Sequence, residues 1–204
     1  MEVRVRFPDG SEIRVPQGTT LAEVARLRGE EGALAAVVDG EPKDLETRLE
    51  RDATVRFLYF EDPEGRAVFW HSSAHLLAQA VKELFPQAKL AIGPPIEEGF
   101  YYDIDIGRPF SPEDLGRIEA KMAELARLDQ RIERIEIPRE EAIRLYTELG
   151  ETYKLELLSE IPDERVSFYR QDGFLDMCRG PHIPRTGLIK AIKLLGTSGA
   201  YWRG

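Results

Sequence analysis

The sequence contains little of what builds disulfides, membrane anchors or export signals. Among its 204 residues there is one cysteine, so no intrachain disulfide can form, and a reducing, cytoplasmic setting is expected. The opening stretch MEVRVRFPDG alternates charged and apolar residues, and we expect no signal peptide there. No apolar run approaches the length that spans a bilayer, so no membrane partner is expected.

Positive charge is also in short supply. The chain carries 28 Lys and Arg against 37 Asp and Glu, a formal net charge of -9. Non-specific affinity for nucleic acid comes from neutralised phosphates, so this balance argues against a protein that wraps nucleic acid by bulk attraction. Recognition of a single nucleic-acid end in a locally basic pocket stays open. Hydrophobic residues make up 42% of the chain, enough for a packed core in one large or two small domains.

Histidine is scarce as well, and its placement is uneven. The three histidines and the one cysteine fall in two short motifs, HxxxH in HSSAHLLAQAV and CxxxH in DMCRGPH. These motifs hold His71 and His75, and Cys178 and His182. The first motif opens an apolar stretch at helical spacing, and residues four apart on a helix share one face. This concentration indicates a functional site, because core histidines would be scattered.

The first sixty residues predict a separate small domain. Residues 3–7 alternate in the manner of a half-buried strand, and Asp9-Gly10 is a turn signal before a second strand at 13–15. A capping box at Thr20 predicts a helix ending at Gly29. Further strands are expected at 35–38 and 55–60, with Asp39-Gly40 as a turn after the first of them. The segment contains no cluster of catalytic residue types, so a docking or spacer module is the plain interpretation.

A polar stretch, EDPEG at 61–65, is interpreted as a linker to a second domain. Beyond it, the pattern predicts helices alternating with short strands, which indicates the α+β class. We expect helices at 71–81, from Ser111 with Pro112 in its first turn, and at 140–149, and strands at 89–92, 100–105, 132–137, 153–158 and 166–170. Residues 174–178 are expected to lead into the tight CRGPH loop.

The motifs alone leave three chemistries open. Two histidines on a helix with a cysteine and a histidine on a loop fit a zinc site, and spacing favours this interpretation. A nucleophilic hydrolase built on Cys178 is weaker, because no nucleophile elbow surrounds it. The third is metal-free hydrolysis, in which a neutral histidine takes a proton from water and Lys154 and Asp176 supply charge. No Gly-rich phosphate loop is present.

Taken together, five stretches resemble threonyl-tRNA synthetase. They are HSSAHLLAQAV, AIGPPIEEGFYYDID, GETYKLEL, DMCRGPHIP and the terminal GAYWRG. The resemblance spans the whole chain. It implies a ubiquitin-like (β-grasp) TGS domain at 1–61 and a larger α+β editing domain of the threonyl/alanyl type at 62–204. The aminoacylation and anticodon-binding domains of that enzyme are expected to be absent, and with them amino-acid activation.

The resemblance also implies roles for individual residues. His71, His75, Cys178 and His182 match the editing-site set, Lys154 and Asp176 match residues that line the pocket, and Tyr102 matches an aromatic at the substrate. We expect the pocket wall to be close-packed side chains and loop backbone around Tyr102, Gly93 and Asp176. It implies that Asp176 binds the α-ammonium of the aminoacyl group and that His71, helped by Lys154, acts on the attacking water. In the alanyl relatives the four-residue set binds zinc, whereas the threonyl branch is expected to need no metal.

The expected substrate is the 3′ end of a threonine tRNA that carries serine by mistake. Single-stranded ends are bound by stacking and base-edge contacts, for which Tyr101 or Tyr102 is available. The alternative class of function is an interaction fragment that binds tRNA or protein without turnover. A deacylation assay separates the two.

Overall fold

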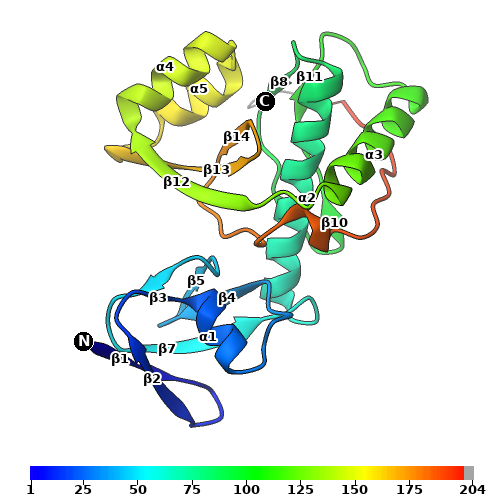
Figure 1. The fold of residues 1–204 in the computed structure, drawn as a ribbon. Helices are drawn as coiled ribbons and strands as arrows, with labels where there is room; N and C mark the ends of the chain where they lie inside the picture. Colours follow the sequence, from blue (N-terminus) through cyan, green and yellow to red (C-terminus); the bar gives the residue numbers. More distant parts are fainter. Residues whose placement is uncertain (200–204) are drawn as a thin grey trace. The chain divides into compact units, whose positions relative to one another are not determined.

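The computed structural model describes residues 1–199 (Figure 1), and the chain forms two compact units. The first unit comprises Met1–Phe69 with Gly180–Pro184, and the second comprises Trp70–Arg179 with Arg185–Gly204. All but the first residue of the terminal GAYWRG motif lies outside the described residues. Across residues 1–199, no helix combines the length and apolar character needed to cross a bilayer.

A five-stranded sheet with strand order β2-β1-β7-β4-β5 forms the first unit. The β1/β2 hairpin is antiparallel, β1 pairs with β7 in parallel, and β4 pairs antiparallel with both β7 and β5. β3 and β6 form a small separate ladder. The strands are β1 (Glu2–Arg6), β2 (Glu12–Pro16), β3 (Thr19–Thr20), β4 (Ala35–Val38), β5 (Glu41–Lys43), β6 (Arg48–Leu49) and β7 (Ala53–Leu58).

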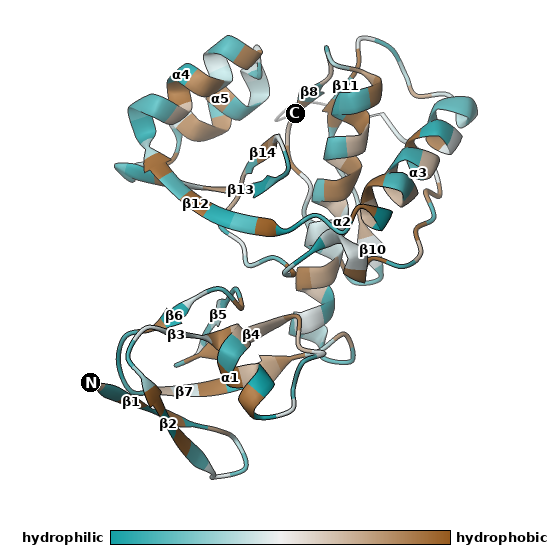
Figure 2. Cartoon of the chain, in the orientation of Figure 1, coloured by the Kyte–Doolittle hydropathy of each residue, from teal (hydrophilic) through white to brown (hydrophobic). Residues whose placement is uncertain are grey.

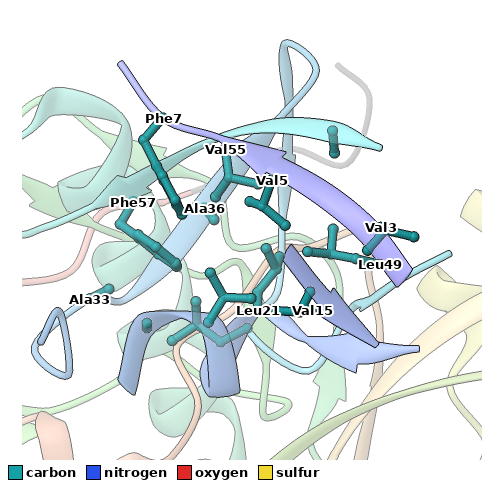
Figure 3. Close-up of a cluster of buried hydrophobic side chains, with 14 residues drawn as sticks. Val3, Val5, Phe7, Val15, Leu21, Ala33, Ala36, Leu49, Val55 and Phe57 are labelled. Atoms are coloured by element: carbon teal, nitrogen blue, oxygen red, sulfur yellow. The ribbon is translucent and has the colours of Figure 1, made fainter. Parts of the chain in front are cut away.

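One helix, α1 (Leu21–Leu27), packs on this sheet and closes an apolar core. The predicted cap is present, since the Thr20 side chain accepts from the Glu23 amide, and Gly29 follows the helix with φ +71. Figure 3 shows the side chains of Val5 and Val55 gathered with Leu21 of the helix. The predicted strands and turns of residues 1–58 are confirmed, and Asp39 and Gly40 both take positive φ between β4 and β5.

The predicted linker at 61–65 is wrong in its second half. Helix α2 (Pro63–Leu84) already begins at Pro63, a residue that suits a first helical turn because its missing amide has no partner there. Gly65 is buried in that turn, and a Cβ at this position would overlap the backbone of Tyr59. The Pro and Gly that suggest a flexible connection therefore serve helix initiation and a close approach.

The second unit contains a three-stranded antiparallel sheet of order β12-β13-β14, two small ladders, β10-β9 and β11-β8, and helices α2 to α5. In Figure 1, α4 and α5 lie side by side. Figure 2 shows the edge strand β12 as largely hydrophilic, with alternate residues exposed. The elements after α2 are β8 (Lys89–Leu90), β9 (Pro95–Ile96), β10 (Gly99–Phe100), β11 (Ile104–Asp105), α3 (Pro112–Arg127), β12 (Ile132–Pro138), α4 (Arg139–Leu149), α5 (Thr152–Ser159), β13 (Arg165–Gln171), β14 (Phe174–Met177) and a 3₁₀ turn, η1 (Thr186–Leu188).

Two sequence predictions fail in this unit. The strand predicted at 153–158 is helix α5, because Lys, Leu and Glu are good helix formers and the segment has no β-branched residue. The continuous strand predicted at 100–105 is broken, since β10 pairs back on β9 while β11 pairs with β8. The chain changes partner between them, and this change leaves Tyr101 and Tyr102 outside any ladder.

The start of α3 agrees with the sequence prediction. α3 starts with a full capping box between Ser111 and Asp114, with Pro112 in the first turn. A buried amide pair joins α2 to the sheet: Gln171 Nε2 on β13 donates to Gln79 Oε1 at 2.7 Å, and both side chains are buried.

Candidate active site

Three elements of the second unit deliver the predicted residues to one place. His71 and His75 lie one turn apart on α2, and their ring centroids are 5.0 Å apart at 85°. Asp176 lies in β14, which ends one residue before Cys178. Lys154 lies in the first turn of α5 and is buried in spite of its charge. The prediction that the histidines share a face is confirmed.

Asp176 is the centre of the cluster. Its side chain is 1% exposed, and Lys154 Nζ lies 2.7 Å from its Oδ1 atom. The Tyr102 hydroxyl donates to Oδ2 at 2.7 Å, and His75 Nε2 lies 3.6 Å from the same oxygen. One carboxylate thus gathers a cation, a phenol and an imidazole out of contact with bulk water.

The two oxygens of Asp176 are not equally used. Oδ2 accepts the Tyr102 hydrogen bond, whereas Oδ1 accepts no hydrogen bond from residues 1–199. Lys154 Nζ is near Oδ1 in distance but poorly aligned, so the contact is an ion pair without hydrogen-bond geometry. A buried carboxylate oxygen in this condition is suited to accept from an ammonium donor brought in by a ligand.

The histidines are held in their neutral form. Burial lowers the pKa of His71 below its ordinary value, and Asp176 opposes this shift only in part. Burial also takes the pKa of His75 well below its ordinary value, with His71 and Lys154 acting in the same direction. A neutral imidazole near pH 7 can accept a proton from water, so His71, the more exposed of the two, has the protonation state of a general base.

Tyr102 is fixed on three sides. Its hydroxyl is bonded to Asp176, and Lys154 Nζ lies 5.4 Å from its ring centroid. Burial and the neighbouring carboxylate raise its pKa well above the ordinary value, so it stays a hydrogen-bond donor. A Cβ on Gly93 would overlap the Tyr102 ring. Gly93, predicted to line the pocket wall, therefore contacts Tyr102 through its bare backbone.

Cys178 and the histidines offer metal-ligand atoms. Cys178 Sγ lies 3.4 Å from His71 Nε2, and the ligand atoms of His71, His75 and Cys178 all lie within 4.8 Å of one another. Two nitrogens and a sulfur in one cluster fit the donor preference of zinc. The fourth predicted member, His182, belongs to the Gly180–Pro184 segment that groups with the first unit, where its backbone amide donates to Asp44 at 2.7 Å.

The structure adds residues that sequence patterns did not single out. Tyr146 on α4 is buried, and its hydroxyl accepts from the Met177 amide at 2.9 Å, next to Asp176 in the chain. Glu151, just before α5, is 3% exposed and bonded to Lys82 on α2. Neither carries a local signal, since a tyrosine on a helix and a glutamate before one are ordinary, and their partners lie 31 and 69 residues away.

Two protein-family models match this chain, one in each unit. The model of the TGS domain matches residues 3–59, and that of the Threonyl and Alanyl tRNA synthetase second additional domain matches residues 166–201. The chain therefore combines a TGS domain of β-grasp type with an α+β second additional domain, and the predicted fold class is confirmed.

The relatives agree with these domain matches. The chain is 55% identical to the threonine–tRNA ligase of Symbiobacterium thermophilum and 51% identical to that of Pelobacter propionicus, each over 99% of this chain and 32% of the relative. The enzyme of Citrifermentans bemidjiense is 48% identical over 100% of this chain and 32% of its own length. The chain is thus homologous to bacterial threonine–tRNA ligases and spans 32% of the length of the curated relatives it matches. The predicted resemblance is confirmed.

Proposed function

We propose that the second unit hydrolyses seryl-tRNA formed in error on the threonine tRNA, a post-transfer editing reaction. The observation that supports this most is the buried carboxylate of Asp176, whose Oδ1 atom accepts no hydrogen bond from residues 1–199 and which lies beside two neutral histidines. An aminoacyl ester brings an α-ammonium and an electrophilic carbonyl together. Asp176 suits the first, and a water activated by His71 suits the second.

In this mechanism the water oxygen attacks the ester carbonyl carbon and passes its proton to His71. Lys154 steadies the negative charge that develops on the carbonyl oxygen. The bond between the carbonyl carbon and the ribose oxygen breaks, the ribose oxygen takes the proton back from His71, and serine and free tRNA result. Asp176 holds the ammonium, and Tyr102 fixes Asp176 through its hydroxyl. His75 helps to orient the Asp176 carboxylate, which it contacts through Nε2.

Selectivity follows from size. Threonine has one methyl group more than serine, and a methylene-sized difference is worth only about 1–3 kcal/mol in a binding pocket. A site that selects threonine for aminoacylation cannot strongly reject the smaller serine. An editing site has to discriminate in the opposite direction, and the close approach of Gly93 to the Tyr102 ring gives a rigid wall of the kind that excludes an added methyl.

The nucleic-acid partner is the tRNA 3′ end, and the reaction is cytoplasmic. Tyr102 is committed to Asp176 through its hydroxyl, whereas Tyr101 is 43% exposed. Tyr101 is therefore the better placed of the two to stack on a terminal base.

The decisive experiment compares two esters of one tRNA. Seryl- and threonyl-esters of the threonine tRNA are incubated with the chain, and each deacylation rate is corrected for the uncatalysed rate. We expect the seryl ester to be hydrolysed and the threonyl ester to be spared. Equal acceleration of both would leave a non-specific esterase. Binding without acceleration of either would support the alternative, an interaction fragment.

Metal is tested separately, because His71, His75 and Cys178 together with His182 form the alternative zinc set. We propose that the site works without a metal cofactor. Protein prepared under reducing conditions without chelator should contain far less than one zinc per chain, and chelation should leave deacylation intact. Stoichiometric zinc, with activity lost on its removal, would instead support zinc-dependent hydrolysis of the alanyl type.

A further inference from the structure

Glu151 is a buried carboxylate that does not touch Asp176 and has no part in the proposed chemistry. It stands at the N-cap position of α5, yet its side chain makes no capping hydrogen bond to that helix. The two oxygens are used elsewhere. Oε1 lies 2.8 Å from Lys82 Nζ on α2, and Oε2 accepts from the Leu90 amide of β8 at 2.9 Å.

Lys82 joins Glu151 to further parts of the chain, and we call this set of contacts the Glu151–Lys82 junction. Besides Glu151, its ammonium donates to the carbonyls of Ala88 at 2.7 Å and Pro86 at 3.3 Å. These carbonyls lie in the short connection between the end of α2 and the start of β8. The Glu151–Lys82 pair therefore ties three segments together: the last turn of α2, the connection after it, and the first residue before α5.

The junction bears directly on Lys154, three residues further along α5. The helix has only eight residues and no side-chain cap, so its own hydrogen bonds fix its position weakly. α2 carries His71 and His75, and the contact of Lys154 with Asp176 requires α5 to be held against the same unit. We propose that Glu151, held by Lys82, is a positioning residue that sets the start of α5 so that Lys154 Nζ reaches Asp176.

A readout independent of activity tests this placement. Amine-acylating reagent is applied to the folded chain, and the labelling rate of each lysine is measured by mass spectrometry. In the wild type Lys154 is buried and should label slowly, whereas Lys193, with 74% of its side chain exposed, should label fast. Glu151→Gln should raise the labelling of Lys154 by roughly tenfold, because the amide no longer holds the Lys82 ammonium. Glu148→Gln, an exposed glutamate on α4, is the matched control and should change nothing.

Folding is checked in the same samples by hydrogen exchange of β13, which should match the wild type. Should Glu151→Gln not fold, Lys82→Met removes the same pair from the more exposed side and should expose Lys154 equally. Labelling of Lys154 at the wild-type rate in the folded variants would overturn the inference.

The activity arm rests on the proposed function. With seryl-tRNA, Glu151→Gln should lower kcat by about ten- to a hundredfold, as small misplacements of a catalytic group do, and leave KM nearly unchanged. In a Lys154→Ala background the same change should have little further effect, because the group it positions is gone. Fully additive losses would show that Glu151 does not act through Lys154. A wild-type chain without deacylase activity would count against the proposed function, and the labelling result would still decide the role of Glu151.

Discussion

The interiors of the two units differ in kind. Within residues 1–69, buried side chains are apolar with the sole exception of Thr19, and ion pairs such as Arg4–Asp52 and Arg6–Glu12 lie between exposed side chains. The second unit buries Lys154 against Asp176. Burying an ion pair costs desolvation energy that an exposed pair does not. The proposed function accounts for that cost in the second unit, since it needs these charges in a low dielectric.

The largest effect is expected where a buried charge loses its partner. Asp176→Asn leaves the Lys154 ammonium uncompensated in the interior, which should lower the free energy of unfolding by about 3–5 kcal/mol. Deacylation should fall to the uncatalysed rate at the same time. Denaturant titration and the seryl-tRNA assay measure the two losses. A variant as stable as the wild type would mean that this pair is no buried ion pair at all.

A core substitution in the first unit should lower the stability of that unit without lowering deacylation by the second. Leu21 is fully buried between α1 and the sheet, and Leu21→Ala should cost about 2–5 kcal/mol through the cavity it leaves. Deacylation by molecules that remain folded should be unchanged. The unfolding transition of the first unit is measured by calorimetry beside the activity. A drop in kcat in folded protein would contradict the view that the core of the first unit contributes only to stability.

The pH dependence sharpens the comparison further. Burial lowers the pKa of His71 and His75 in the folded state, so the unfolded chain binds more protons once the pH falls below 6.5. The free energy of unfolding should therefore be unaffected by these groups above pH 6.5 and decrease as the pH falls below it. The acid limb of the deacylation profile should lie below pH 6.5, since neutral His71 persists to lower pH. His71→Ala should abolish that limb along with most activity, and a limb centred above pH 6.5 would contradict a buried neutral base.

The smallest effect is expected at the exposed edge of the second unit. Tyr101→Ala should raise KM for seryl-tRNA about fivefold or more through lost stacking, with kcat nearly unchanged. Tyr101→Phe retains the ring and should behave as wild type. Leu128→Ala removes another exposed apolar side chain, 62% accessible on the C-terminal side of α3, and is the control. Identical KM values for Tyr101→Ala and wild type would remove Tyr101 from the tRNA contact.

Local signals could be predicted from the sequence wherever local chemistry decides the structure. The Ser111–Asp114 capping box and the Asp39-Gly40 turn are determined by side chains a few residues apart, and both are present. The helix at 153–158 could not be predicted, because the alternating Tyr, Lys, Leu and Glu of this segment look like a half-exposed strand. In the structure Lys154 is on the buried side of a helix, a placement that breaks ordinary patterning and that is expected at functional sites.

For the site, the sequence provided the residue types but not their arrangement. The spacing of His71 and His75 predicts their shared face, and the ring contact confirms it. The convergence of Lys154, Tyr102 and Asp176 depends on elements that pair over long sequence separations. The residue types suggested Lys154 and Asp176 as pocket charges, and only the family resemblance added Tyr102. Glu151 escaped both kinds of reasoning, since nothing in a glutamate before a helix marks it as buried.

The amide pair between Gln79 and Gln171 has a consequence for how the second unit responds to its medium. Dissolved salt screens charges over about 8 Å at physiological strength and weakens the attraction of any protein for tRNA phosphates. A buried bond between two uncharged amides is indifferent to that screening. The helix that carries the histidines is thus bonded to the sheet that carries Asp176 by a hydrogen bond that ionic strength does not weaken. Rising salt should weaken capture of the tRNA and leave the alignment of the reacting groups intact.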